Sequence, residues 1–334
     1  MLPATMKSVT CQELGSLDHV QIKDLPVPMP KDGEVLIKVD AAGLNFADTL
    51  MVKGRYQEKP DLPFTMGLEL AGTIAAIGAN VSDFGLGEPV FAVVPQGAFA
   101  GYAIAKASAT IKRPANMPAA IAAALPINYG TAHGALAWKA RLQKCETVLV
   151  HGAAGGTGLA AVACAKAMGE RVIATARGAG RAAIALDHGA DVALDSERAD
   201  LVDAIKKAVD PKSNRGRIDV VFDTVGGALF DQSLRCLAFN GRLLLIGFAG
   251  GQVPQIPANI LLVKNADAHG FYWGSYQHHS NALWRDGLSW VANQWTTGQI
   301  TPQLDQEFAL EDFKDAVSRL QARKATGKII LKPG

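Results

Sequence analysis

Cysteine is scarce in this sequence of 334 residues. Its four cysteines, Cys11, Cys145, Cys164 and Cys236, are widely scattered and form no Cys-x-x-Cys pair. This distribution argues against a disulfide framework and against a structural zinc site. We therefore expect a protein of a reducing, cytoplasmic compartment.

Long apolar runs and an excess of one charge are also missing. No stretch approaches the roughly 18 apolar residues that a membrane-spanning helix needs, and residues 1–10 lack the apolar centre of a signal peptide. The formal net charge of +2 gives no indication of a nucleic-acid or membrane surface. We expect about two domains, no nucleic-acid partner and no membrane insertion. Met1 and Met6 are both candidates for the native start.

The sequence does contain one strongly organised stretch, residues 147–177. Residues 147–150 are a short β-branched run that predicts a buried strand, and four glycines follow within the next eight residues. Residues 159–168 are small and helix-forming, and residues 172–176 predict a second buried strand. Strand, glycine turn, helix and strand within about thirty residues is the context that gives a glycine motif meaning.

The turn has nearly the spacing of the dinucleotide-binding motif G-x-G-x-x-G. Ala153 stands in the first glycine position, and Gly155 and Gly158 fill the other two, with Gly156 and Thr157 between them. Gly155 would let the backbone approach a pyrophosphate, and Gly158 would let the helix pack closely on the strand. The free N–H groups of the helix would then bind the anion. A tight turn in a non-binding α/β domain is the alternative, and the flanking elements favour dinucleotide binding.

The rest of the chain predicts an α/β fold in which a doubly wound parallel sheet, a Rossmann domain, is combined with a mostly β domain. Residues 6–100 contain short strands between proline and glycine, with a hairpin turn at residues 31–33. A helix is expected at residues 118–125, capped by Asn116. The expected strands of the first part are residues 20–25, 34–41, 72–77, 89–94 and 97–105.

From about residue 128, helices alternate with short buried strands, which indicates a parallel sheet. The predicted strands are 148–151, 172–176, 191–194, 219–223 and 243–247, with 268–272 as a sixth; residues 210–216 form a surface loop. Helices at 283–297 and 310–323 and a strand at 328–332 complete the chain. We place the domains at residues 1–127, 128–272 and 273–334, the last packing back on the first.

Four motifs in a fixed order resemble a known superfamily. They are Ala-Gly-Leu-Asn-Phe-Ala-Asp at 42–48, Gly-Leu-Glu-Leu-Ala-Gly at 67–72, the glycine turn, and Gly-Lys-Ile-Ile-Leu at 327–331. Together they resemble the medium-chain dehydrogenase/reductase superfamily and, within it, the zinc-free NADPH:quinone oxidoreductases. The resemblance implies a GroES-like catalytic domain split by an inserted NADPH-binding Rossmann domain, an active site in the cleft between them, and a homodimer.

The sequence departs from the zinc-dependent alcohol dehydrogenases at their metal ligands. Asn45 occupies the position of a cysteine ligand and Leu68 that of a histidine ligand, and neither side chain suits Zn²⁺. Residues 95–105 and their neighbours lack the cysteines of the structural-zinc lobe. The adjacent His278 and His279 make a poor metal site without a third ligand. We therefore expect no metal. We also expect a conjugated acceptor, because conjugation lets the carbonyl oxygen carry the charge after hydride transfer without a Lewis acid.

The resemblance assigns the substrate side of the site. Asn45 would lie near the nicotinamide or the substrate carbonyl, as a catalytic and cofactor-binding residue; a structural turn residue is the alternative. Tyr56 would line the substrate pocket together with Leu68 and could donate a proton to the accepting oxygen; a packed loop tyrosine is nearly as good an interpretation. Asp48 and Glu69 are better interpreted as structural hydrogen-bond partners than as acids or bases.

The resemblance also assigns residues of the second domain. Thr131 would contact the nicotinamide side of the cofactor, and Gly247 and Phe248 would border the cofactor cleft. Tyr129 and Trp273 would line the substrate pocket, where aromatic side chains suit a flat conjugated ligand; an ordinary core position is the alternative for such aromatics.

The end of the second strand decides between NADPH and NADH. An NAD-specific site carries a carboxylate there, whereas an arginine accommodates a 2′-phosphate. The sequence has Arg177 and Arg181, with no carboxylate before Asp187, which favours NADPH; a solvated pair of arginines is the alternative. Ser196 stands where the family has a tyrosine near the phosphate, and Lys328 is assigned to cofactor binding by resemblance.

The sequence thus predicts a cytoplasmic, zinc-independent NADPH-dependent reductase that transfers hydride to a quinone or another conjugated carbonyl. An enoyl or enone double-bond reductase, acting on an unsaturated ketone or acyl thioester, is the alternative within enzymes. An NADPH-binding sensor or structural protein without turnover is the alternative of another class.

Overall fold

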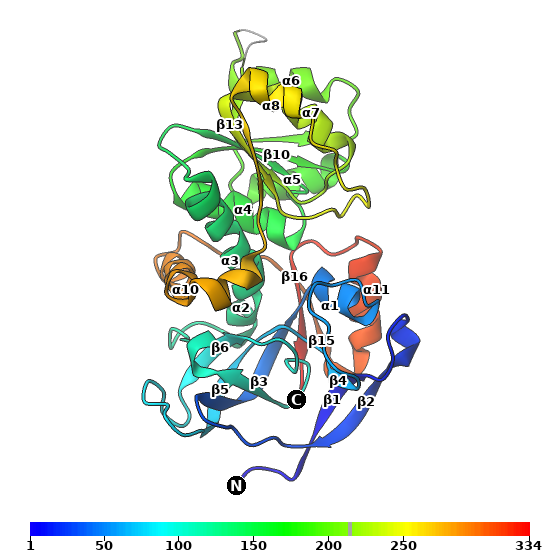
Figure 1. Ribbon diagram of the computed structural model, residues 1–334, viewed down its shortest axis with the longest axis vertical. Coiled ribbons are helices and arrows are strands. Elements are labelled where there is room, and N and C mark those ends of the chain that lie inside the picture. Colours follow the sequence, from blue (N-terminus) through cyan, green and yellow to red (C-terminus); the bar gives the residue numbers. More distant parts are fainter. Residues whose placement is uncertain (213–215) are drawn as a thin grey trace. The chain divides into compact units, whose positions relative to one another are not determined.

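The computed structural model describes residues 1–212 and 216–334, which form two compact units (Figure 1). One unit comprises Met1–Ile127 and Pro302–Gly334, and the other comprises Asn128–Thr301. The sequence placed the return from the second domain at residue 273, whereas residues 273–301 belong to the second unit. The reason is local packing, because Trp290 of this segment stacks on His133 of the second unit, with ring centroids 4.5 Å apart. The predicted loop at 210–216 lies partly outside the described residues.

The first unit is mostly β, as the short punctuated runs predicted. Its strands are β1 (Thr5–Cys11), β2 (Val20–Pro26), β3 (Glu34–Leu44), β4 (Phe64–Thr65), β5 (Glu69–Ile77), β6 (Pro89–Val93), β7 (Tyr102–Lys106), β8 (Thr110–Lys112), β15 (Leu304–Ala309) and β16 (Lys328–Lys332). Its helices are α1 (Phe46–Val52), α2 (Ala119–Ala124) and α11 (Phe313–Gln321), with single 3₁₀ turns η1 (Leu17–His19), η2 (Ala107–Ala109) and η5 (Leu310–Asp312).

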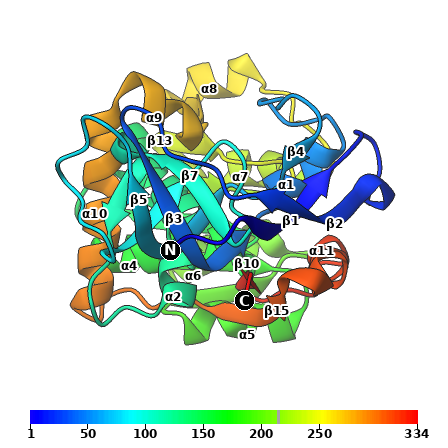
Figure 2. The same ribbon diagram turned by 90° about the horizontal axis from the view of Figure 1, so that it is seen from below.

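These strands form a small sheet in the order β2-β1-β4 and a seven-stranded sheet in the order β15-β16-β3-β5-β6-β8, with β7 also paired to β3 (Figure 2). The C-terminal strand β16 pairs antiparallel with β3, so that Ile330 lies opposite Gly43. This pairing joins the two ends of the chain into one core, which includes Val35, Ile37 and Leu331.

Two local predictions for this unit were wrong. Residues 31–33 do not make a hairpin, because β2 pairs with β1 and β3 pairs with β5, in different sheets. Asn116 does not cap α2. The helix begins after Pro118, whose fixed φ of −60° suits a helix start, and Asn116 remains exposed.

The second unit contains one six-stranded sheet and its covering helices. The strands are β9 (Thr147–His151), β10 (Arg171–Ala176), β11 (Val192–Asp195), β12 (Ile218–Asp223), β13 (Leu237–Leu245) and β14 (Asp267–Gly270). The helices are α3 (Pro126–Gly134), which begins at the boundary, the π-helical turn η3 (Ala135–Ala140), α4 (Gly156–Ala167), α5 (Ala179–Asp187), α6 (Leu201–Val209), α7 (Ala228–Cys236), α8 (Ala258–Lys264), η4 (Trp273–Ser275), α9 (Tyr276–His279) and α10 (Asn281–Thr296).

All six strands are parallel and lie in the order β11-β10-β9-β12-β13-β14. In chain order this is 3-2-1-4-5-6, the arrangement of a dinucleotide-binding sheet. Helices α4 and α5 cover one face of the sheet and α6, α7 and α8 the other (Figure 1). Every residue of β9 is buried, which explains why its central residues, 148–150, are a continuous apolar run and not an alternating one. The predicted fold class is therefore confirmed.

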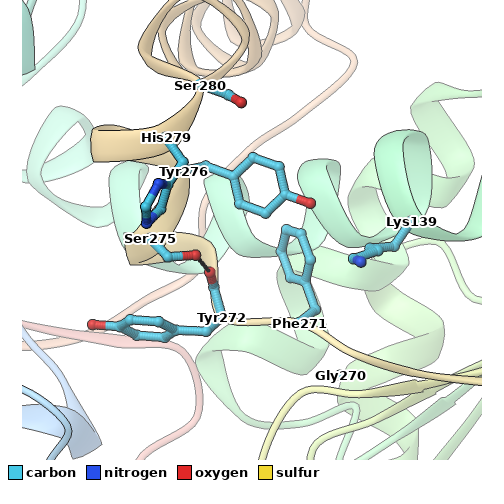
Figure 3. Close-up of a pocket in the computed structure, with 8 residues that line it drawn as sticks. All are labelled: Lys139, Gly270, Phe271, Tyr272, Ser275, Tyr276, His279 and Ser280. Atoms are coloured by element: carbon cyan, nitrogen blue, oxygen red, sulfur yellow. Dashed lines mark hydrogen bonds between the residues drawn. The ribbon is translucent and has the colours of Figure 1, made fainter.

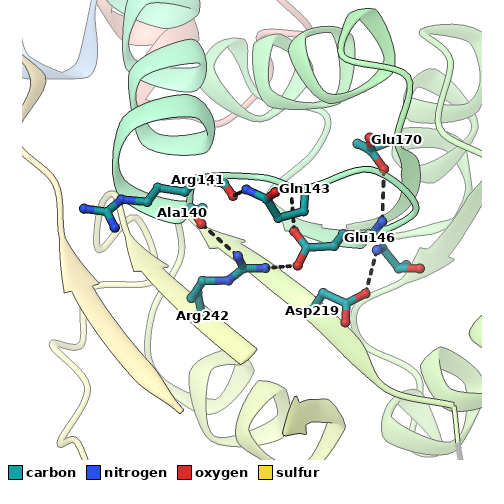
Figure 4. A network of polar contacts seen from close by, with 8 residues as sticks. Ala140, Arg141, Gln143, Glu146, Glu170, Asp219 and Arg242 are labelled. Carbon is teal, nitrogen blue, oxygen red and sulfur yellow. Dashed lines mark hydrogen bonds and ion pairs between the residues drawn. The ribbon is translucent and has the colours of Figure 1, made fainter. Parts of the chain in front are cut away.

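A polar network fixes the start of this sheet, at the end of the strands opposite to the glycine turn (Figure 4). Arg242 pairs with Glu146 and also donates to the carbonyl oxygen of Ala140 at 2.8 Å. The backbone N–H of Glu146 donates to Glu170 at 3.0 Å, and that of Thr147 donates to Asp219 at 2.8 Å. Because these groups hold the amino ends of the strands, we assign the network to architecture.

Across the described ranges, no helix combines the length and the apolar character needed to cross a bilayer.

Candidate functional site

The glycine turn lies at the carboxyl end of β9, beside the point where the sheet order reverses. Gly155 is the N-cap of α4, which begins at Gly156, three residues before the predicted start. A Cβ on Gly158 would overlap the carbonyl oxygen of Gly152 and would lie 2.8 Å from the Cα of Ala153. Only glycine lets helix and strand approach this closely, as the spacing predicted.

The turn fits a pyrophosphate. A Cβ on Gly155 would meet only the carbonyl oxygen of Gly152, at 3.5 Å, so the outer side of this residue is open. The first N–H groups of a helix have no intrahelical partner, and α4 is 12 residues long. Its start therefore combines free donors with the positive end of the helix dipole, which suits a phosphate.

Asn128, in α3, contacts the glycine turn and was not predicted from the sequence. Its Oδ1 accepts a hydrogen bond from the hydroxyl of Thr157 at 3.0 Å, and its amide lies where a Cβ on Gly156 would be only 2.5 Å away. An asparagine between two apolar residues gives no signal of this contact. Of the neighbouring predicted residues in α3, Thr131 is half-buried, while Tyr129 is only 4% exposed and burial raises the pKa of its phenol.

The two predicted phosphate-binding arginines lie at the edge of the sheet. Arg181, in α5, donates to the carbonyl oxygen of Ala154 at 3.3 Å, which brings it beside the glycine turn. Arg177, directly after β10, is exposed and its Nε lies 3.2 Å from a carboxylate oxygen of Glu197. Glu197 was not predicted as a site residue, because its proximity to Arg177 depends on how the loop after β11 folds back.

In the first unit, three predicted motifs meet in a buried polar cluster of Asn45, Glu69 and Lys328. The Lys328 ammonium is ion-paired with Glu69 and donates to Asn45 Oδ1 at 2.6 Å. Asn45 Nδ2 donates to Glu69 Oε1 at 2.8 Å and to the Gly43 carbonyl oxygen at 3.2 Å. These side chains are at most 6% exposed, so the charges are shielded from water and the pairing is strong.

Further hydrogen bonds of Asp48 and Glu69 connect this cluster to the backbone. Asp48 accepts the Asn45 backbone N–H at 2.7 Å, and the other oxygen of Glu69 accepts the Ile127 N–H at 2.8 Å. Burial raises the pKa of Asp48 to about 7, against the lowering effects of the Asn45 N–H and the Lys328 charge. No room remains beside Gly43 of β3, since a Cβ on this residue would lie 2.5 Å from the carbonyl oxygen of Ala123 in α2.

Counting hydrogen bonds limits what Asn45 can do. Both of its amide protons are used, and its Oδ1 retains one lone pair after accepting from Lys328. Asn45 can therefore accept one further hydrogen bond, for example from a carboxamide or a hydroxyl. It has no proton left to donate to a substrate carbonyl unless this cluster rearranges.

The other predicted substrate-side residues differ in exposure. Tyr56 is half-buried and packs against the core of the first unit. Leu68 is 5% exposed within that core. Trp273 is 4% exposed in the second unit, where its indole ring lies on Gly130. Because they are buried, Leu68 and Trp273 present little surface that a substrate could contact, and they support neighbouring residues instead.

Gly247 and Phe248 follow β13, which ends at Leu245, so they lie in a loop and not at the strand end that was predicted. Phe248 is exposed, and it would lie 3.2 Å from a Cβ on Gly226, in the loop after the neighbouring strand β12. The two residues thus remain at the carboxyl edge of the sheet, on the same side as the glycine turn.

A separate cavity of about 260 Å³ lies in the second unit (Figure 3). It is lined by Lys139, Gly270, Phe271, Tyr272, Ser275, Tyr276, His279 and Ser280. The cavity is smaller than most small-molecule sites, and its residues Phe271 and Tyr272 directly precede Trp273, which was predicted to line the substrate pocket. In the part of the chain that the structure covers, no three His, Cys, Asp or Glu side chains gather as metal ligands would.

Residues 31–115 match the family described as alcohol dehydrogenase GroES-like domain, and residues 156–293 match the zinc-binding dehydrogenase family. Quinone oxidoreductase-like protein 2 of Rattus norvegicus is 40% identical over 299 residues, covering 89% of this chain and 84% of the relative. The quinone oxidoreductase of Homo sapiens is 33% identical, covering 98% and 97%.

The chain belongs to the quinone oxidoreductases of the medium-chain dehydrogenase/reductase superfamily. It is therefore an oxidoreductase, as predicted. Two solved structures of this fold are especially similar. Mycobacterial Rv1454c, complexed with NADPH, has a TM-score of 0.89 and 31% identity, covering 98% of this chain and 100% of that chain. A quinone oxidoreductase of Pseudomonas syringae has a TM-score of 0.89 and 28% identity over the same shares.

Proposed function

We propose that this oxidoreductase is a zinc-independent, NADPH-dependent reductase that delivers hydride to a quinone or another conjugated carbonyl compound. The carrying observation is the dinucleotide turn after β9, together with Arg177 directly after β10 and Arg181 in α5. Asn45 and Leu68 at the metal-ligand positions support zinc independence. The names of the relatives and the NADPH complex of the mycobacterial neighbour support the acceptor class and the cofactor.

In this proposal the second unit holds the cofactor. The start of α4, with Gly155, Gly156, Thr157 and Gly158, binds the pyrophosphate. Arg177 and Arg181 bind the 2′-phosphate. The nicotinamide half is bordered by Thr131, Gly247 and Phe248. When bound, NADPH supplies a hydride from the nicotinamide ring, and the protein contributes orientation and the exclusion of water.

In this proposal, the Asn45 cluster orients the nicotinamide, and Tyr56 lies beside the hydride acceptor. Lys328 and Glu69 hold the Asn45 amide in one orientation, so that its remaining lone pair can accept a hydrogen bond from the nicotinamide carboxamide. Tyr56 or solvent supplies the proton that accompanies the hydride. Leu68, Tyr129 and Trp273, each buried in the core of its own unit, support from behind the surfaces that bind the acceptor.

An acceptor panel tests the proposal. NADPH oxidation would be followed with 1,4-benzoquinone, with cyclic and open-chain enones and with an enoyl thioester, and the products identified. We expect quinone turnover well above the rate without enzyme. Turnover of enones or the thioester alone, with saturation of the double bond, would favour the double-bond reductase. Tight NADPH binding without oxidation by any acceptor would favour the sensor.

We also propose a cytoplasmic homodimer. The support is that β14 ends the sheet order, so one edge of β14 is open to pairing within the described strands. Leu262 and Val263 of α8, which precedes β14 in the chain, are 77% and 76% exposed, and exposed apolar side chains favour association. Light scattering should give twice the chain mass of 35.1 kDa; the mass of one chain would contradict the dimer.

A further inference from the structure

The loop after β11 brings a carboxylate onto the arginine that follows β10. Strands β10 and β11 are parallel with Ala176 opposite Asp195, and the Ser196 N–H donates to the Ala176 carbonyl oxygen at 2.8 Å. Glu197 is the next residue, and its Oε1 lies 3.2 Å from Arg177 Nε.

The backbone around this pair is fixed by one side chain. Asp195 Oδ1 accepts the Gly178 N–H at 2.8 Å and the Glu197 N–H at 3.0 Å. It thereby ties the loop that follows Arg177 to the loop that carries Glu197. Gly178 has φ of +77°, which lets the chain turn directly after Arg177. The proximity of Glu197 to Arg177 is therefore a property of two joined loops and not of two long side chains alone.

We propose that Glu197 is a specificity-determining residue that weakens the preference of this enzyme for NADPH over NADH. The inference rests on the proposed function, in which Arg177 binds the 2′-phosphate. A 2′-phosphate must displace the Glu197 carboxylate from Arg177 and then lies close to a like charge. The neutral ribose hydroxyl of NADH meets no such repulsion and can donate to a carboxylate. Glu197 therefore opposes the binding of one cofactor and not of the other.

The expected effect is moderate. Both side chains of the pair are 62% exposed. Exposed ion pairs change an equilibrium constant by a factor of about 2 to 5. Removing the carboxylate should therefore raise the ratio of the NADH dissociation constant to the NADPH dissociation constant about 2- to 5-fold.

Cofactor binding without turnover tests this inference. The dissociation constants of NADPH, NADH, adenosine 2′,5′-bisphosphate and 5′-AMP would be measured by calorimetry for the wild type, Glu197→Gln, Arg177→Ala and the double variant. Low ionic strength keeps screening small. Asp200→Asn is the matched control, because Asp200 is an exposed carboxylate of the same loop, pairs with Arg198 at 2.6 Å and gives the same change of charge.

We expect Glu197→Gln to tighten binding of the two ligands that carry a 2′-phosphate, and Asp200→Asn to leave the ratio near its wild-type value. In the Arg177→Ala background, the Glu197 substitution should change the ratio less than it does in the wild type, because no Arg177–Glu197 pair has to be broken. An unchanged ratio in Glu197→Gln, or an equal change in Asp200→Asn, would overturn the inference. A wild type that binds adenosine 2′,5′-bisphosphate no better than 5′-AMP would instead overturn the proposed phosphate site itself.

Discussion

His133 shows how a single buried side chain ties the stability of the second unit to pH. Its imidazole stacks on Trp290 with ring centroids 4.5 Å apart and meets the edge of Trp138 at 5.6 Å. Its Nδ1 is buried and has no hydrogen-bond partner among the described residues. Burial lowers the pKa of His133 to about 4, because the charged ring would lose its hydration.

This environment predicts acid sensitivity. Since the pKa of the folded state lies below the ordinary value of 6.5, the stabilisation is complete above that pH and is lost as the pH falls toward 4. The free energy of unfolding should fall by about 2 to 3 kcal/mol from this residue between pH 7.5 and 4.5. Urea unfolding of His133→Phe, which keeps the stacking, should show a smaller fall than wild type. Identical falls would refute the assignment.

The Glu69–Lys328 pair predicts strong coupling in the first unit. Removing one partner of a buried ion pair leaves an uncompensated charge, which costs about 3 to 5 kcal/mol. Lys328→Met should therefore lower the free energy of unfolding by that amount, and the double variant Glu69→Gln with Lys328→Met should recover part of the loss. Urea unfolding of all four proteins measures the cycle. Losses that simply add would contradict the pairing.

At the residue scale, the sequence identified the residues of the buried cluster but not the contacts between them. Asn45, Glu69 and Lys328 all lie in motifs that were recognised, yet Asn45 and Lys328 are 283 positions apart, and no local spacing encodes their contact. Glu69 was expected to be a structural hydrogen-bond partner, and it accepts hydrogen bonds from the Asn45 amide and the Ile127 N–H. Glu197 gave no signal, because its contact with Arg177 depends on two loops joined through Asp195.

At the scale of the elements, two glycines in the turn from β9 to α4 have different roles, one in packing and one in cofactor binding. A Cβ at Gly158 would collide with the backbone of Gly152, whereas one at Gly155 has room. Gly158→Ala should destabilise the second unit by more than 1 kcal/mol, within the range of about 1 to 3 for overpacking. Gly155→Ala should keep the melting temperature within a few degrees and weaken NADPH binding at least about 10-fold, because the methyl group occupies the pyrophosphate position.

Thermal unfolding and NADPH calorimetry on both variants make the comparison. The two substitutions serve as each other's control, since they add the same methyl group three residues apart. Unchanged NADPH affinity in Gly155→Ala would remove the pyrophosphate from this turn.

The predictability of the elements followed their burial. Strand β9 is buried along its whole length, so an unbroken apolar run marked it clearly. The start of β13 was missed by six residues, because Ala238, Phe239 and Asn240 are half-buried or exposed and interrupt the pattern. The hairpin at 31–33 was wrong because a turn signal does not say which strands will pair.

At the scale of the whole molecule, the order of the motifs predicted more than any periodicity could. It implied that the C-terminal strand returns to the first unit, and β16 does pair with β3. It did not give the return point, because the stacking of Trp290 on His133 holds α10 in the second unit, and a contact between residues so far apart leaves no mark in the hydrophobic pattern.

The central claim is that this chain transfers hydride from NADPH to a conjugated carbonyl without a metal. The most direct measurement is the rate of NADPH oxidation with 1,4-benzoquinone by enzyme from which metals have been removed with a chelator, alongside untreated enzyme and metal analysis. We predict equal rates and less than about 0.1 zinc per chain, since Asn45 and Leu68 cannot replace the thiolate and imidazole ligands. Loss of activity on chelation, with recovery on adding zinc, would contradict the account.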